Sequence, residues 1–254
     1  MIFDTHTHYD AEQFDKDRVE LLSSMREHNV GFILNVGATL DGCKSSVEFA
    51  RKYPFMYAAV GVHPDEVGAL NDETFAWMEE LLLDEKTVAV GEIGLDYYWD
   101  NEPREVQKEW FIRQLELARK HDLPVCIHSR DAAEDTLNVM REYAKGLRGV
   151  IHCFSYSPEI AKEYVKNGFY IGVGGVVTFK NGKKMKEVVK ATPIERILLE
   201  TDCPYLAPEP YRGKRNSSIY LDRVAEEIGQ LKGMTANEVI EATEQNAKTL
   251  FGIA

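Results

Sequence analysis

The chain has 254 residues, 44% hydrophobic and 28% charged, and its 30 basic and 42 acidic residues give a formal net charge of −12. The length excludes a disulfide-stapled miniprotein, and the apolar fraction excludes a chain that is disordered throughout. The acidic balance argues against a protein that coats long nucleic acid or an anionic membrane through bulk charge.

The cysteines and the N-terminus indicate the compartment. The four cysteines are widely separated and include no C-x-x-C pair, as expected for reduced thiols of a cytoplasmic protein. The first residues show neither the basic nor the apolar region of a signal peptide, and no apolar stretch approaches the ~20 residues of a membrane span. We therefore expect a soluble, cytoplasmic protein that does not interact with membranes.

Eight short apolar or β-branched runs alternate with stretches of helical periodicity. The runs are Ile2–His8, Phe32–Gly37, Met56–His63, Val88–Leu95, Pro124–Ser129, Val150–Phe154, Tyr170–Val177 and Ile197–Asp202. Eight strand-helix units in this length predict an α/β fold, the (β/α)8 TIM barrel, as a single domain over residues 1–254. A doubly wound open sheet is the alternative.

Three of the helical stretches carry recognisable signals. Ser157-Pro158 predicts an N-cap followed by a proline in the first turn, and Gly168 lies where that helix would end. Thr235 and Glu238 have the spacing of a capping box that begins the C-terminal helix. The amphipathic stretch 105–121 predicts a long helix between the fourth and fifth strands.

Histidines and carboxylates gather at the ends of the predicted strands. Five of the seven histidines lie there, Glu92 lies near the end of the fourth run, and Asp202 closes the eighth. The active site of a barrel forms at this rim from the ends of several strands, whereas an open sheet gathers its site at one switch point. The spread of such residues over the first, fourth, fifth, sixth and eighth strands favours the barrel.

His6 and His8 are the pair that most directly indicates a metal. At positions i and i+2 of a strand, about 7 Å apart along the chain, their side chains point to the same face. Two imidazoles so placed can bind one divalent cation. For a lone pair of this kind, hydrogen bonding in a rim loop would be the better interpretation, but the other strand-end residues favour the metal.

Each of the other candidate ligands has a structural alternative. Glu92 lies between glycines in an apolar strand, where a carboxylate must be paired or metal-bound. His128 and His152 could be buried core histidines, and Asp202 could be a helix N-cap. Two groups of residues are expected not to bind metal. They are the core cysteines Cys126, Cys153 and Cys203, and the surface histidines His28 and His121.

Together these motifs resemble the TatD family of metal-dependent deoxyribonucleases, in the amidohydrolase superfamily. The resemblance runs almost end to end through His-x-His (6–8), GVHP (61–64), GEIGLD (91–96), HSRDA (128–132), HCFS (152–155), ETDCPYL (200–206) and RGKRN (212–216). The chain departs from the family at Cys203, where alanine is common, and at Ser217-Ser218, where an acidic residue and proline are common. Neither departure removes a ligand position.

The resemblance implies two metal ions. One would be held by His6, His8, Glu92 and Asp202, and the other by Glu92, His128 and His152, so that Glu92 bridges them. Two metals about 4 Å apart suit in-line displacement at phosphorus by an activated water, and Asp202 would be the general base. The imidazoles favour Zn²⁺ or Mn²⁺, whereas the family is usually described as Mg²⁺-dependent.

Basic and aromatic residues near the same rim are candidates for substrate contacts. Arg212, Lys214, Arg215 and Asn216 follow the eighth strand and could clamp a phosphate, and the alternative is a solvated charge cluster. Arg130 is a second candidate cation unless it pairs with Asp131 or Glu134. His63 is expected to contact substrate or water. Tyr97, Tyr98 and Trp99 could stack on nucleobases or merely pack their loop.

We therefore expect a cytoplasmic hydrolase of ester bonds that cleaves DNA phosphodiesters, acting as an exonuclease on single-stranded or terminal segments, with no obligate protein partner. The first alternative is another ester or amide hydrolase, such as one acting on an aminoacyl-tRNA ester or a cyclic amide. The second is a metal-bound scaffold without turnover, which the presence of all the ligand positions disfavours.

Overall fold

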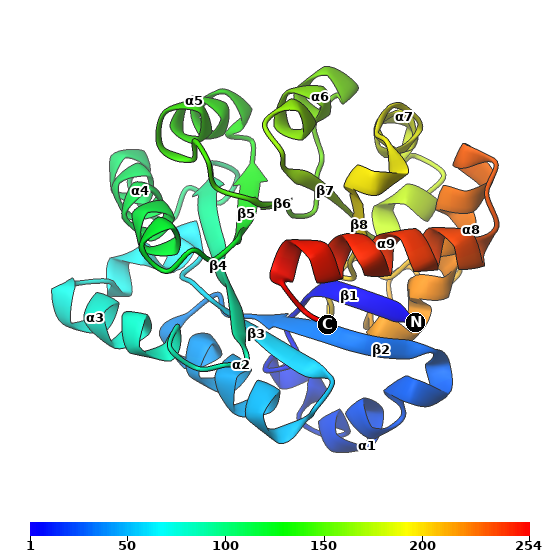
Figure 1. The fold of residues 1–254 in the computed structure, drawn as a ribbon, viewed down its shortest axis with the longest axis horizontal. Helices are drawn as coiled ribbons and strands as arrows, with labels where there is room; N and C mark the ends of the chain where they lie inside the picture. Colours follow the sequence, from blue (N-terminus) through cyan, green and yellow to red (C-terminus); the bar gives the residue numbers. More distant parts are fainter. The chain divides into compact units, whose positions relative to one another are not determined.

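The computed structural model describes residues 1–254, and these fall into two compact units. The first unit comprises Met1–Asn35 and Cys153–Ala254, and the second comprises Val36–His152. Along the whole chain, strands and helices alternate as Figure 1 shows, and the strand order is β1 to β8. This order and alternation are those of the predicted (β/α)8 barrel.

The first unit holds the strands from both ends of the chain. β1 pairs in parallel with β2, β7 pairs in parallel with β8, and a bridge between Thr7 and Cys203 joins the two pairs. The elements are β1 (Ile2–Thr7), α1 (Arg18–Ser23), β2 (Val30–Val36, its last residue in the second unit), α6 (Pro158–Lys166), β7 (Tyr170–Val173), α7 (Lys183–Ala191), β8 (Ile197–Leu199), α8 (Leu221–Lys232) and α9 (Ala236–Phe251).

The second unit contains four consecutive parallel strands. β3 pairs with β4, β4 with β5, and β5 with β6. All ten residues of β4 are buried, which is typical of a strand covered on both faces. The elements are α2 (Leu40–Lys52), β3 (Met56–Val60), α3 (Asp72–Leu81), β4 (Thr87–Asp96), α4 (Arg104–Lys120), β5 (Val125–Arg130), α5 (Ala133–Tyr143) and β6 (Gly149–Ile151).

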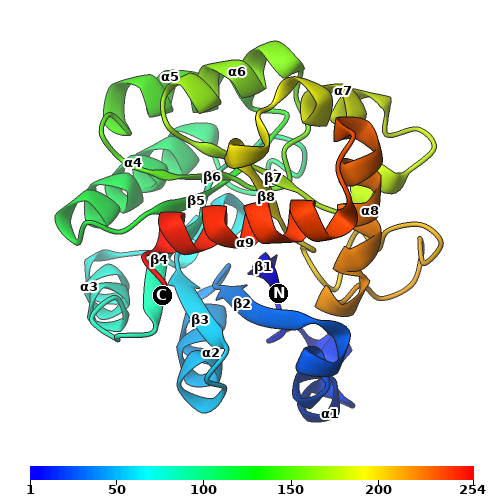
Figure 2. The same ribbon diagram turned by 45° about the vertical axis from the view of Figure 1, so that its right-hand side comes forward.

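The predicted helix signals are confirmed. Ser157 is the N-cap of α6 with Pro158 in the first turn, and Gly168 follows the helix with φ of 91°. The capping box of Thr235 and Glu238 begins α9, which packs against β1 and β8 (Figure 2). α4 covers the predicted long helix to within a residue at each end. None of the helices combines the length and the apolar composition that a membrane span requires.

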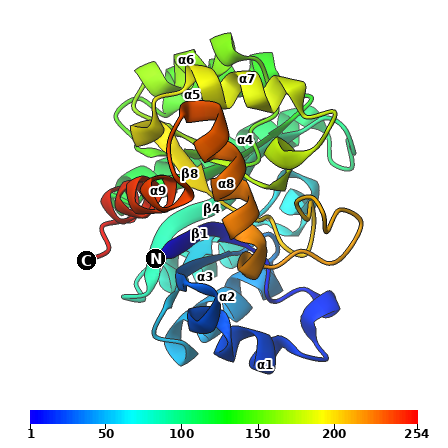
Figure 3. The same ribbon diagram turned by 90° about the vertical axis from the view of Figure 1, so that its right-hand side faces the viewer.

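Several strands end earlier than the apolar runs suggested. β3 ends at Val60, β6 at Ile151 and β8 at Leu199. His63, His152 and Asp202 therefore lie in the loops that follow their strands rather than on the strands. The segment between β8 and α8 is long, and Figure 3 shows it beside α8.

Candidate metal and active site

In the first unit, two histidines and an aspartate converge after β1 and β8. His6 is the fifth residue of β1, and His8 follows the strand directly. Their Nε2 atoms are 3.2 Å apart, and the His8 Nε2 lies 3.5 Å from Asp202 Oδ1. His6 is fully buried and the other two are largely buried, so the three side chains form one enclosed imidazole–carboxylate cluster.

Asp202 is held by its backbone. Its φ of 58° is in the left-handed region, which is uncommon for residues other than glycine and frequent at functional sites. The Asp202 N–H donates to the His6 carbonyl at 3.0 Å, and the Asn216 side-chain amide donates to the Thr201 carbonyl at 2.9 Å. The loop that carries the Asp202 carboxylate is thus hydrogen-bonded both to β1 and to Asn216, the last residue of the basic segment 212–216.

A buried carboxylate below this cluster secures the same loop. Asp4 on β1 accepts hydrogen bonds from the backbone N–H and the hydroxyl of Thr201 at 3.0 and 2.7 Å, and from the hydroxyl of Ser218 at 2.7 Å. The His6 N–H adds a longer one at 3.3 Å. Burial raises the pKa of Asp4 to about 7, although these hydrogen bonds act to lower it.

In the second unit, His128 lies between two carboxylates. Its Nδ1 is 2.8 Å from Glu92 Oε1, and its Nε2 is 3.0 Å from Asp96 Oδ2. Burial lowers the pKa of His128, but the two carboxylates outweigh burial and raise the pKa to about 9. The His152 Nε2 lies 3.6 Å from the same Glu92 oxygen. The Glu92 carboxylate therefore gathers two imidazoles.

His63 extends this second cluster. Its ring is edge-on to His128 with centroids 4.3 Å apart, and its Nδ1 accepts a hydrogen bond from the Asp65 N–H at 3.2 Å. Burial raises the pKa of the Asp65 carboxyl to about 6, and the nearby Asp96 acts in the same direction. The structure places His63, which was expected to contact substrate or water, among carboxylates and imidazoles.

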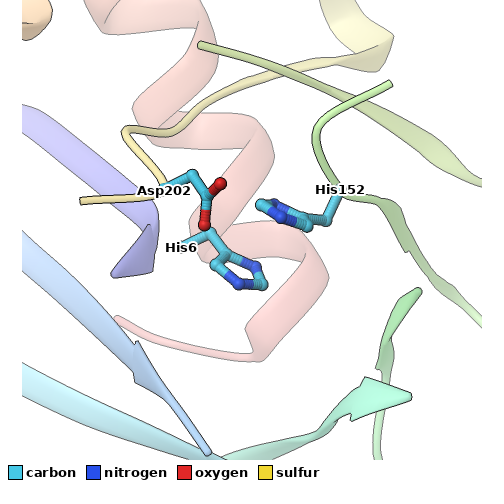
Figure 4. Close-up of side chains that lie close together, drawn as sticks. All are labelled: His6, His152 and Asp202. Atoms are coloured by element: carbon cyan, nitrogen blue, oxygen red, sulfur yellow. The ribbon is translucent and has the colours of Figure 1, made fainter. Parts of the chain in front are cut away.

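The two clusters contain the types of ligand atom that bind divalent metal ions. In the second unit, ligand atoms of His63, Glu92 and His128 lie within 4.8 Å of one another. In the first, the cluster of His6, His8 and Asp202 offers the same donor types at the distances given above. Imidazole nitrogens with carboxylate oxygens are the donor set of zinc, manganese and related ions. Figure 4 shows the side chains of His6 and Asp202, and it also labels His152.

Two buried glutamines bind the backbone beside the second cluster, one at the end of β4 and one in the loop before His63. Gln107 on α4 donates to the Asp96 carbonyl at 3.1 Å and accepts from the Asp96 N–H at 2.9 Å. Gln114 on the same helix makes the matching pair with the N–H and carbonyl of Val62, just before His63. The two amides thus pair backbone groups of Asp96, the last residue of β4, and of Val62, in the loop after β3.

The predicted cation Arg130 lies on an aromatic surface. Its guanidinium lies 3.8 Å from the ring centroid of Tyr98 and 5.7 Å from that of Trp99. Both rings are more than half exposed. The expected alternative, an ion pair with Asp131 or Glu134, is not what the structure shows; the arginine stacks instead, which leaves an exposed cationic and aromatic patch.

The basic segment after β8 divides into members with different partners. Arg215 forms a two-pronged ion pair with Asp17 at 2.7 and 2.6 Å, and Asn216 is fully buried. Arg212 stacks over Phe179 at 4.2 Å, and Lys214 is exposed. The charge of Arg215 is therefore already balanced, and Arg212 and Lys214 are the members presented to solvent.

Two expectations about residues outside the site need correction. His121 is half-buried and bonded to Glu79 at 2.7 Å, because α3 brings a carboxylate to the end of α4, so it is not a solvated surface histidine. Cys153 is partly exposed, with φ of 44°, whereas Cys126 and Cys203 are buried as expected. His28 is exposed. None of the four cysteines forms a disulfide.

Comparisons with known proteins show which sequences and structures the chain resembles. Residues 3–252 match the family model of TatD related DNases. The chain is 47% identical over its full length to the uncharacterized metal-dependent hydrolase YabD of Bacillus subtilis, and 33% identical to the 3'-5' ssDNA/RNA exonuclease TatD of Escherichia fergusonii, with all of both chains covered. The crystal structure of the TatD homologue YJJV from Escherichia coli superposes with a TM-score of 0.93 at 31% identity, covering 100% of this chain and 98% of that one.

Proposed function

Because the chain belongs to the TatD family of metal-dependent hydrolases, we propose that it is a nuclease that removes nucleotides from the 3′ ends of single-stranded DNA. The observation that carries this proposal is the convergence of His6, His8 and Asp202 at the carboxyl ends of β1 and β8, where a barrel places its chemistry. The exonuclease activity named for the relative from Escherichia fergusonii supports the substrate and the polarity.

We assign the metal ligands to the two clusters. The proposal is that two divalent ions are held by six residues: His6, His8, Glu92, His128, His152 and Asp202. Mg²⁺ or Mn²⁺ would support activity, and the imidazoles would bind Zn²⁺ more tightly. When bound, the ions would stabilise the negative charge that develops on the phosphate during displacement.

The chain's own residues supply the rest of the reaction. Asp202, fixed by its backbone, takes the proton of the attacking water as general base. In the first unit, Arg212 and Lys214 contact phosphates of the strand, and in the second unit Arg130 is a further proposed phosphate contact. The exposed rings of Tyr98 and Trp99 stack on bases of the single strand, as is usual in proteins that bind single strands without sequence preference. Arg215 and Asn216 position the segment that carries Lys214.

The cellular location, the protein partners and the competing activity complete the proposal. None of the four cysteines forms a disulfide, which supports a cytoplasmic location. We propose no obligate protein partner. Hydrolysis of another ester or of an amide is the competing activity, since the same residues would serve both reactions.

A substrate panel tests the proposed function. The protein is incubated with Mg²⁺ or Mn²⁺ and 5′-labelled single-stranded DNA, duplex DNA, an aminoacyl-tRNA and a cyclic amide. We expect progressive shortening of the single strand from its 3′ end, loss of that activity with chelator, and its return when the metal is restored. Turnover of the ester or the amide without release of nucleotides would overturn the proposal.

A further inference from the structure

A pocket lies beside Asp202 at the carboxyl ends of β7 and β8, entirely within the first unit. It has a volume of about 210 Å³. Its wall includes the loop after β6, the segment after β7, the start of α7 and the loop after β8. We call it the β7–β8 pocket. Because Asp202 forms part of its lining, whatever occupies it lies next to the proposed general base.

The size of the β7–β8 pocket limits its occupant. Pockets that enclose a whole drug-sized ligand measure roughly 300–1,000 Å³. At about 210 Å³ the pocket can hold one ring system and cannot hold a complete nucleotide. The occupant is therefore a part of the substrate, with the remainder lying outside.

The walls of the pocket favour an apolar, planar group. Phe154, Val176, Met185 and Leu206 contribute hydrophobic side chains. Phe154 and Met185 are themselves buried, so they form a fixed surface rather than a mobile one. Enzymes that hold a single base do so between apolar or aromatic side chains of this kind.

The polar groups of the pocket disfavour an anion. Two carboxylates, those of Glu200 and Asp202, line the pocket, against one cation, Lys184. Glu200 is 1% exposed, and its Oε1 accepts the Cys153 N–H at 2.6 Å. A phosphate in the pocket would meet this excess of negative charge, whereas the ring N–H and amino groups of a nucleobase can donate to carboxylates.

Asn181 adds a group suited to reading a base edge. It lies at the pocket wall, and its Oδ1 is 3.4 Å from the guanidinium of Arg212, which is stacked on Phe179. A side-chain amide offers both a donor and an acceptor. The arginine beside it carries the charge that the neighbouring phosphate requires, just outside the pocket.

From these observations we propose that the β7–β8 pocket binds the nucleobase of the terminal nucleotide, next to the phosphodiester that is cut. This inference rests on the proposed nuclease function and deepens it. It makes the protein selective for ends that carry a base, without requiring a particular sequence.

The test compares two substrates that differ only in the terminal base. One single strand ends in an ordinary 3′ nucleotide and the other in a tetrahydrofuran residue, which has no base. We expect the wild-type protein to remove the ordinary nucleotide with a kcat/KM at least about 10-fold higher, in keeping with the energy of stacking one base. The variant Met185→Trp fills the pocket and should lose this preference while retaining its rate on the abasic end.

Asn181→Ala and Lys183→Ala provide a second, gentler pair of variants. Both residues are exposed near the start of α7, but only Asn181 lines the pocket. We expect Asn181→Ala to raise KM for the ordinary end several-fold and to leave the abasic end unchanged, with Lys183→Ala behaving as wild type on both. Equal wild-type rates on the two ends, or equal effects of Met185→Trp and Asn181→Ala on both, would overturn the proposal.

A binding measurement separates this inference from the nuclease proposal. Calorimetric titration with deoxyadenosine should show binding to the wild-type protein that Met185→Trp abolishes, while deoxyribose should not bind. If neither end is hydrolysed but deoxyadenosine binds in this pattern, the pocket assignment stands and the nuclease function is wrong. If deoxyadenosine does not bind, the pocket assignment is wrong.

Discussion

Asp4 shows how a residue outside the ligand set can control the site. Its carboxylate accepts hydrogen bonds from the backbone and hydroxyl of Thr201 and from Ser218, which lie 197 and 214 residues further along the chain. It therefore ties β1 to the loop that presents Asp202. Groups that orient metal ligands in this way commonly affect metal affinity or activity by 10- to 100-fold when they are changed.

We expect Asp4→Asn to lower kcat about 10-fold with little change in KM. The asparagine amide would point a donor at hydroxyls that now donate to the Asp4 carboxylate. Because a donor cannot accept these hydrogen bonds, Thr201 would shift, and Asp202, the next residue, would shift with it. Steady-state kinetics on single-stranded DNA measure the split between kcat and KM. Asp41→Asn, at an exposed position in the first turn of α2, is the matched control and should leave both constants unchanged. A wild-type kcat in Asp4→Asn would contradict this role.

At the scale of elements, the alternation of strands and helices could be predicted because it depends on local periodicity and capping. Ser157, Thr235 and Gly168 act within their own turns, so their signals survive in the sequence. The ends of β3, β6 and β8 could not be predicted, because a strand ends where its neighbour stops pairing. His63 and His152 therefore lie in loops that apolar runs alone cannot delimit.

The candidate ligands could be predicted by type and place, but their supports could not. His6, His8 and Asp202 stand out because polar groups at strand ends are unusual in an otherwise apolar setting. Asp4 lies two residues before His6, and Asp96 ends the GEIGLD motif. Only the tertiary structure shows that Asp4 holds a loop and that Asp96 pairs with His128. Gln107 and Gln114 look like ordinary residues of an amphipathic helix.

The capping box of α9 gives a prediction at this scale. The Thr235 hydroxyl accepts the Glu238 N–H at 3.2 Å, and the Glu238 carboxylate accepts the Thr235 N–H at 2.7 Å. We expect Thr235→Ala to lower the free energy of unfolding by about 1 kcal/mol, as loss of an N-cap usually does. Urea denaturation of the wild-type protein and the variant measures this difference in the free energy of unfolding. Thr249→Ala, at an exposed position near the end of the same helix, should change stability by less than half as much; equal losses would show that capping is not the cause.

For the whole molecule, the net charge of −12 restricts how nucleic acid can be bound. Much of the basic segment after β8 is already neutralised or buried, as Arg215 and Asn216 show. Bound divalent ions would supply positive charge that the chain itself lacks. The acidic composition is thus compatible with weak, metal-dependent binding of short or terminal segments, and it argues against tight coating of long duplexes.

Because bound ions would supply the positive charge that the acidic chain lacks, we expect metal removal to weaken DNA binding as well as hydrolysis. With chelator present, we expect the dissociation constant for a short single strand to be about 10⁻⁴ M or weaker, the upper end of the range for non-specific binding. Added Mn²⁺ should lower this dissociation constant at least several-fold. Fluorescence anisotropy with a labelled, cleavage-resistant phosphorothioate strand measures both states, and tight binding in chelator would contradict this account of the charge.

We propose that Asp202, held in its cluster with His6 and His8, is the general base of metal-dependent hydrolysis at DNA ends. The most direct measurement is the rate of 3′-nucleotide release from 5′-labelled single-stranded DNA with Mn²⁺, compared between the wild-type protein and Asp202→Asn at equal metal content. We predict a loss of 10²- to 10⁴-fold in kcat, the usual contribution of a general base, with Asp41→Asn as active as wild type. Wild-type release of nucleotides by Asp202→Asn would contradict the claim.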